Sequence, residues 1–126
     1  MRAAAAIVPG PEIVVGIAVA AGVLEAEGVS ARVIDMHTVK PLDREAIGRA
    51  AAETGAIVVA EEHLVDCGLG VRVAQAVTEI NPCVMEFVGI HDRYAESGHP
   101  DEMLEKYGLV ARDIAAAARK ALARKR

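Results

Sequence analysis

Short apolar runs alternate along the chain with longer segments in which apolar residues recur every three or four positions. The short runs are typical of strands buried in a sheet, and the wider spacing is typical of helices that cover one face. The pattern predicts strands at residues 3–8, 31–36, 56–60 and 83–90. It predicts helices at residues 11–27, 43–54, 73–80, 100–107 and 111–126.

Residues that favour turns and helix ends separate these elements. Pro9-Gly10-Pro11 predicts a turn, after which Pro11 and Glu12 enter the first turn of a helix. Asp43 is a predicted N-cap, and Gly55 is predicted to end the helix that follows. The alternation of strands and helices predicts a mostly parallel sheet with helices on both faces.

The composition agrees with an α/β fold and argues against a protein that binds nucleic acid. The 126 residues correspond to one domain, 1–126, and 53% of them are hydrophobic, with Ala and Val dominant. Aromatic residues make up 2%, which is too few for the stacking platforms that bind single-stranded nucleic acid. The net charge of −4 also argues against a phosphate-backbone partner, so we expect no nucleic acid.

The charge is unevenly distributed, because residues 111–126 are strongly basic. This segment either contacts an anionic surface or forms a solvated helix end whose cations complement the helix dipole.

Cys67 and Cys83 are far apart and belong to no CxxC motif, which favours a reduced, cytoplasmic protein. Apolar runs are too short to span a membrane, so we expect no membrane association.

Polar residues follow the second predicted strand, where open α/β sheets bind ligands. His37, Thr38 and Lys40 combine an imidazole, a hydroxyl and an ammonium group, which together could form an anion site. The same residues could instead cap the strand and satisfy the backbone of the loop. The sequence leaves both interpretations open.

Glu61, Glu62 and His63 follow the third predicted strand. Two carboxylates beside an imidazole could act as an acid/base pair. Neighbours in a strand point to opposite faces, so at most Glu61 and His63 share a side, and the three cannot all reach one metal ion. The alternative is a structural role, in which the carboxylates bond to loop amides or to another subunit.

Two further segments are candidates for binding. Gly68-Leu69-Gly70 could let an anion approach the start of a helix, or it could simply pack closely. In the polar stretch 91–99, which includes Ser97, Arg93 could hold a carboxylate or phosphate. It could instead pair with Glu96 or with Glu61 and Glu62. We find no Ser/His/Asp or Cys/His spacing and no metal motif, so the residues alone indicate no catalytic or metal site.

Several segments taken together resemble the transketolase C-terminal domain. They are ARVIDMHTVKPLD at 31–43, VVAEEH at 58–63 followed by GLG at 68–70, DRYAESG at 92–98 and LEKYGL at 104–109. Cys67 stands where the family usually has the first of two glycines, and Tyr94 stands where Phe is common. The resemblance covers essentially the whole chain, and the residues of these motifs are most similar to those of transketolase, including its split, two-chain forms.

The resemblance implies a three-layer α/β/α sandwich with a mostly parallel, five-stranded mixed sheet in which one strand is antiparallel. Four strands are visible in the pattern, so we expect the fifth near residues 108–111. It also implies a transferase that moves ketol groups between sugar phosphates with thiamine diphosphate and Mg²⁺. In that family the cofactor belongs to the N-terminal and pyrimidine-binding domains.

The chain has no GDG…N motif for metal and diphosphate, so we expect it to bind no cofactor itself. We expect an excised domain or a short subunit that is inactive alone and needs those other domains as partners. The residues that we expect at an interface or ligand contact are His37, Lys40, Glu61, Glu62, His63, Arg93 and Ser97. An Ala/Val-rich face left uncovered would favour a homodimer.

Two other readings stay open at this point. The chain could be the C-terminal domain of deoxyxylulose-phosphate synthase or of a 2-oxo acid dehydrogenase beta subunit, since these enzymes share the domain. It could also be a stand-alone regulatory module that binds a small ligand at its strand ends.

Overall fold

The described part of the chain, residues 2–9 and 13–126 of a computed structural model, contains one parallel sheet. Its strand order is β2-β1-β3-β4, and each neighbouring pair is parallel. The strands are β1 (Arg2–Val8), β2 (Val29–Asp35), β3 (Ala56–Leu64) and β4 (Val84–Ile90). The alternation of short apolar runs therefore located all four strands.

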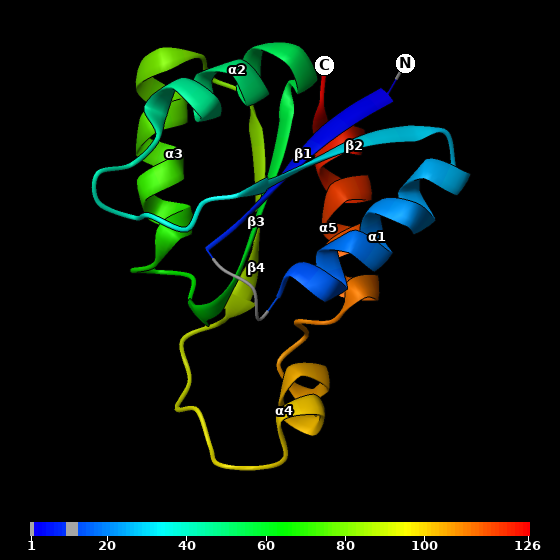
Figure 1. Ribbon diagram of the computed structural model, residues 1–126, viewed down its shortest axis with the longest axis vertical. Coiled ribbons are helices and arrows are strands. Elements are labelled where there is room, and N and C mark those ends of the chain that lie inside the picture. Colours follow the sequence, from blue (N-terminus) through cyan, green and yellow to red (C-terminus); the bar gives the residue numbers. More distant parts are fainter. Residues whose placement is uncertain (1, 10–12) are drawn as a thin grey trace.

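Helices cover both faces of the sheet, as Figure 1 shows. They are α1 (Val14–Ala26), α2 (Arg44–Thr54), α3 (Leu69–Ile80), α4 (Pro100–Lys106) and α5 (Ala111–Arg124). α1 and α5 pack together on one face, while α2 and α3 pack together on the other. The predicted three-layer α/β/α class is confirmed, and α4 lies apart from the layers, beyond the end of the sheet (Figure 1).

β3 is buried on both faces, which explains its unbroken apolar run. Val58 joins the core beneath α1 and α5, whereas Ile57 and Val59 join the core beneath α2 and α3. All three are at most 1% exposed. Side chains alternate between the faces of a strand, so consecutive apolar residues are needed where both faces are covered.

Alanine allows the layers to pack closely. β1 contributes Ala4 to one core and Ala5 to the other. α5 presents a row of buried alanines to the sheet and to α1, at positions 115, 118 and 121. Small side chains let the helices fill the interior at normal packing density without long side chains to interdigitate. This accounts for the scarcity of aromatic residues in the composition.

The predicted start and end of the second helix agree with the structure. The Asp43 side chain accepts a hydrogen bond from the Ala46 N–H at 3.0 Å, which confirms the predicted N-cap. Gly55 ends α2 with a φ of 64°, a left-handed conformation that favours glycine. The predicted entry of Pro11 and Glu12 into the first helix, and Gly10 of the predicted turn, fall outside the described residues.

The prediction of a fifth strand near residues 108–111 is wrong, since the described residues there form a connection between two helices. Gly108 has a φ of 71°, and the Leu109 N–H donates to the Leu104 carbonyl at 2.9 Å. The Val110 N–H donates to the Asp113 carboxylate at 3.2 Å. These backbone donors are satisfied locally, at the end of α4 and the start of α5, so none is left to pair with a sheet.

The basic α5 uses its cations in ion pairs within the chain. Lys120 and Arg124 both pair with Glu86 of β4, and Arg119 pairs with Glu27. Burial alone would raise the pKa of Glu86, but the hydrogen bonds and the positive charges of Lys120 and Arg124 together outweigh it and lower that pKa. The ion pairs attach α5 to the sheet edge and to the end of α1.

None of the helices in the described residues is long and apolar enough to cross a membrane.

Candidate functional site

A pocket of about 550 Å³ lies where β3 ends and α3 begins. This is the carboxyl end of a central parallel strand, the usual place for ligands on open α/β sheets. The pocket is lined by Pro9, Val39, Glu61, Glu62, His63, Cys67, Gly68, Leu69 and Arg72. It therefore contains Glu61, Glu62 and His63, together with part of the candidate segment Gly68-Leu69-Gly70, and adds an arginine from the first turn of α3.

The Glu61 carboxylate lies beneath this pocket and is 2% exposed. Its Oε2 atom accepts a hydrogen bond from the Gly70 N–H at 2.7 Å, at the start of α3. Its Oε1 atom is buried and has no hydrogen-bond partner among the described residues. Burial raises the pKa of Glu61, and the N–H groups of Gly70 and Leu69 and the charge of His63 offset only part of that rise.

Glycine is required at positions 68 and 70 because the backbone there comes close to neighbouring side chains. A Cβ atom at position 68 would lie 1.5 Å from Glu61 Oε1, and one at position 70 would lie 2.7 Å from the Phe87 ring. Cys67 is exposed, and no non-glycine residue in the described chain has a positive φ. The substitution of the family's usual glycine by Cys67 is therefore compatible with the loop.

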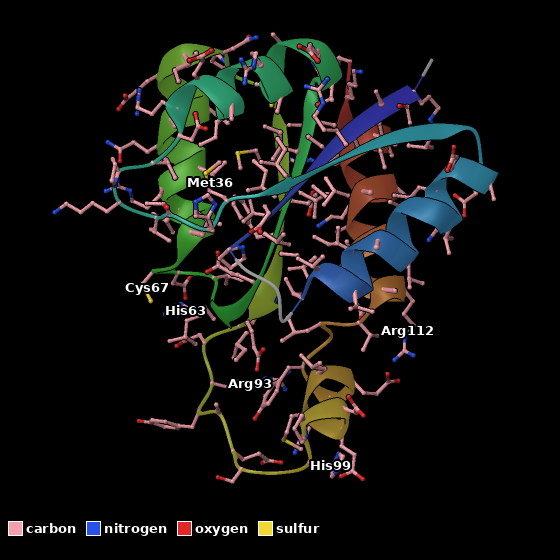
Figure 2. All side chains as sticks on the ribbon, in the orientation of Figure 1. Met36, His63, Cys67, Arg93, His99 and Arg112 are labelled. Carbon is pink, nitrogen blue, oxygen red and sulfur yellow. The ribbon has the colours of Figure 1, made fainter. Side chains whose placement is uncertain are left out.

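His63 and Cys67 lie together at the edge of the pocket (Figure 2). The His63 Nδ1 atom is 3.1 Å from the Leu64 carbonyl oxygen and 4.0 Å from Cys67 Sγ. The same Nδ1 is 3.8 Å from Glu61 Oε1, a charge contact beyond hydrogen-bond length. A catalytic triad needs the two imidazole nitrogens on different partners, so this cluster is not arranged as one.

The predicted site residues fall in three separate places. Glu61 and His63 lie on one side as expected, and Glu62 also lines the pocket. His37 and Lys40 are exposed on the connection between β2 and α2, where Val39 rather than either of them lines the pocket. Ser97 is exposed in the 91–99 loop.

Arg93 does not pair with Glu96 but lies over the Tyr107 ring, 4.8 Å from its centroid. Glu96 pairs instead with Lys106, and its N–H donates to the Tyr107 hydroxyl at 3.0 Å. Tyr107 is buried, so it fastens the otherwise exposed 91–99 loop to the end of α4. Arg93 therefore supports the loop and stands apart from the pocket (Figure 2).

Sequence reasoning missed Arg72 and Cys67 as site residues. The helix predicted at 73–80 excluded Arg72, whereas α3 begins at Leu69 and places Arg72 in its first turn. Within residues 2–9 and 13–126, no group of three or more His, Cys, Asp or Glu side chains is arranged to hold a metal ion.

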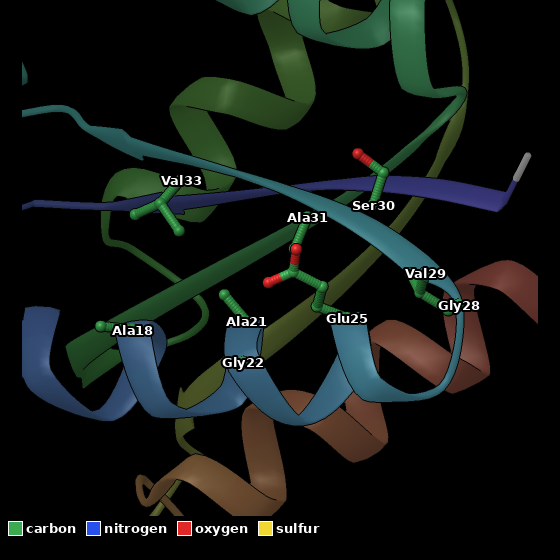
Figure 3. Close-up of a pocket in the computed structure, with 9 residues that line it drawn as sticks. All are labelled: Ala18, Ala21, Gly22, Glu25, Gly28, Val29, Ser30, Ala31 and Val33. Carbon is green, nitrogen blue, oxygen red and sulfur yellow. The ribbon is translucent and has the colours of Figure 1, made fainter.

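A second hollow, of about 630 Å³, runs between α1 and the edge strand β2 (Figure 3). Ala18, Ala21 and Gly22 line it from the helix, and Val33 lines it from the strand. Glu25 is the ionisable side chain in this hollow. Most residues that line this hollow are small and apolar and have no side-chain group that could bind or react. The pocket over Glu61 is therefore the better candidate for a functional site.

Gly68→Ala is expected to destabilise the chain by about 1–3 kcal/mol, because the new methyl group overlaps Glu61 Oε1. Urea unfolding followed by circular dichroism measures the change. Gly22→Ala is the matched control: nothing lies within 4 Å of its Cβ, and alanine inside helix α1 should stabilise by roughly 0.5–1 kcal/mol. Equal effects of the two substitutions would contradict the close approach at Gly68.

Glu61 should make the folded chain less stable as the pH rises. Unfolded, Glu61 loses its proton near 4.5, the ordinary glutamate pKa, whereas the folded chain holds that proton to higher pH. Stability should therefore fall between pH 4.5 and the raised pKa of folded Glu61, and then level off. The free energy of unfolding of the Glu61→Gln variant should not fall over this pH range. That of the exposed control variant Glu62→Gln should fall as in the unmodified chain. An unchanged decline in Glu61→Gln would refute this account.

Known proteins of similar sequence identify the domain. The family described as Transketolase, C-terminal domain matches residues 7–114. The 6-deoxy-6-sulfo-D-fructose transketolase subunit SqwH of Clostridium sp. (strain MSTE9) is 43% identical over 115 residues, which make up 87% of this chain and 36% of that protein. The 1-deoxy-D-xylulose-5-phosphate synthase of Heliobacterium modesticaldum is 42% identical over 101 residues, or 79% of this chain and 16% of that protein.

A solved structure agrees with these matches over nearly the whole chain. It is titled a split gene transketolase, inactive beta4 tetramer, and superimposes with a TM-score of 0.91 at 45% identity. The superposition covers 99% of this chain and 40% of the other, so this chain spans well under two thirds of each of these relatives. The chain belongs to the transketolase C-terminal domain family.

Proposed function

We propose that the chain is an assembly and regulatory domain of a transketolase-type enzyme that transfers ketol groups between sugar phosphates. The observation that carries this proposal is the match to split transketolases, with 45% identity and a TM-score of 0.91 over 99% of this chain. The SqwH relative is likewise named as a transketolase subunit. In this proposal the N-terminal and pyrimidine-binding domains, or a subunit that carries them, are the partners.

The complete enzyme would use thiamine diphosphate and Mg²⁺, but the described residues do not fit that cofactor. The start of α3 would be the natural cradle for a diphosphate, yet the buried Glu61 carboxylate already occupies it. A second carboxylate, Glu62, lines the same pocket, and no described cluster is arranged to hold a metal ion. These features support a cofactor site on the partner domains and an isolated chain that is not catalytic.

A deoxyxylulose-phosphate synthase is the second candidate, because the Heliobacterium enzyme of that name is 42% identical over 79% of this chain. The two candidates share this domain, and the choice between them depends on which substrates the partner chain uses. A cytoplasmic location accords with the two cysteines, which are both free.

Mixing this chain with the catalytic chain of a split transketolase tests the proposal directly. With thiamine diphosphate, Mg²⁺, a ketose phosphate donor and an aldose phosphate acceptor, the mixture should transfer the ketol group, while this chain alone should not. Co-elution on a sizing column should accompany the activity. The proposal fails if the catalytic chain is equally active with and without this domain.

We also propose that the chain self-associates through α1. Val15, Val19 and Val23 repeat at every fourth position on the outer side of this helix, and Val15 is 73% exposed. A helix that is apolar on its outer side is usually covered, and the similar solved structure is titled a tetramer of beta chains. A homodimer is the simplest closed assembly that would cover this face.

Light scattering on a sizing column should give a dimer mass for the chain and a monomer mass for the double variant Val15→Lys/Val19→Lys. The matched control is Val71→Lys, which places a lysine on a comparably exposed valine of α3. A monomer before any substitution, or dissociation by Val71→Lys alone, would count against α1 as the contact.

A further inference from the structure

The Glu61 carboxylate is only half satisfied by its own chain. The Gly70 N–H donates to Oε2 at 2.7 Å, while the equally buried Oε1 receives no hydrogen bond from the described residues. Buried carboxylate oxygens without a donor are rare, because removing them from water costs free energy that only a hydrogen bond or a counter-charge recovers. The unpaired Oε1 therefore points to a donor that comes from outside.

The Leu69 N–H faces the Glu61 carboxylate and lowers its pKa, but no group of the described residues makes a hydrogen bond to Oε1. His63 Nδ1 stands 3.8 Å from Oε1 and lies closer, at 3.1 Å, to the Leu64 carbonyl oxygen. Gly68 has no side chain to offer, and any side chain there would collide with Oε1. Oε1 thus lies against Gly68 and His63, both of which line the pocket of about 550 Å³.

The pocket has the size and lining of a small-molecule site. Its volume lies within the usual range for such sites, and Val39, Leu69 and Pro9 supply apolar walls. The start of α3 would ordinarily attract an anion, but the Glu61 carboxylate already fills that role through Gly70. What remains to be satisfied is a negative oxygen, so the complementary ligand group is a positive donor.

We propose that this pocket binds a small organic cation whose ammonium or guanidinium group donates to Glu61 Oε1. A charged donor suits a buried carboxylate better than a neutral hydroxyl, because an ionic hydrogen bond offsets the cost of burying both charges. Glu62 lines the same pocket and adds negative charge. Arg72 also lines the pocket and could pair with an anionic group elsewhere on the ligand, so we expect the ligand to carry a single positive charge.

This inference does not depend on the proposed function, since the pocket is built entirely from this chain. It is tested on the chain alone, without a catalytic partner or sugar phosphates. Failure of the ketol-transfer experiment would therefore leave it untouched, and its own failure would leave the assembly role untouched.

The experiment titrates the full chain with n-butylammonium chloride near neutral pH and follows the Glu61 carboxyl carbon by NMR. The resonance should shift and saturate, with a Kd on the order of millimolar for so small a probe. The neutral probe n-butanol, which has the same carbon chain, should bind at least roughly tenfold more weakly because it lacks the charge.

Two variants complete the test. Glu61→Gln keeps an acceptor for the Gly70 N–H and removes the charge, and it should weaken n-butylammonium binding by roughly tenfold or more. Glu25→Gln, which neutralises an exposed glutamate of α1 outside this pocket, should change binding by less than about threefold. If Glu61→Gln does not fold, the Glu61 resonance of the unmodified chain still decides the question.

Three results would overturn the inference. One is a Glu61 resonance that does not move with n-butylammonium, and another is equal binding of n-butylammonium and n-butanol. The third is a Glu61 resonance that shifts with protein concentration in the absence of any probe, since a second copy of the chain would then supply the donor.

Discussion

The hydrogen bond between the Glu61 carboxylate and the Gly70 N–H joins the end of β3 to the start of α3, and the candidate site depends on it. It places an acidic side chain at the positive end of a helix, where a carboxylate is electrostatically favoured. The contact also fixes the loop sequence, because a Cβ atom at position 68 would overlap Glu61. The end of the central strand, the two glycines and the helix start are therefore one unit, and the pocket is the space above it.

The sheet holds this unit in place through its small residues. β3 lies in the middle of the sheet with its apolar residues buried on both faces, so its carboxyl end cannot shift without disturbing both cores. Alanines in β1 and α5 bring the layers close together, and the ion pairs of Glu86 with Lys120 and Arg124 attach α5 to the sheet edge. The rigid layers support a site whose polar groups come from strand ends and loops.

The fold could be predicted from the sequence because its signals are local. Four strands, the α/β/α layers and the Asp43 cap follow from periodicity and helix-end chemistry. The fifth strand was placed wrongly at 108–111, because the family resemblance implied five strands and the local hydrogen bonds to Leu104 and Asp113 could not be seen in the sequence. The site was predicted only in part. Strand alternation put Glu61 beside His63, but the unpaired Oε1 depends on distances that no spacing in the sequence determines.

The placement of Glu61 also bears on how such a domain divides its tasks with a partner. A helix start at a strand end is where a diphosphate would bind, and here an internal carboxylate holds that position. In our proposal this internal carboxylate takes the place of an external anion at the helix start and makes the pocket selective for positive donors. A domain built in this way can fold and present a surface independently of cofactor loading. We propose that its contribution to an enzyme comes through contacts and ligand binding at its strand ends.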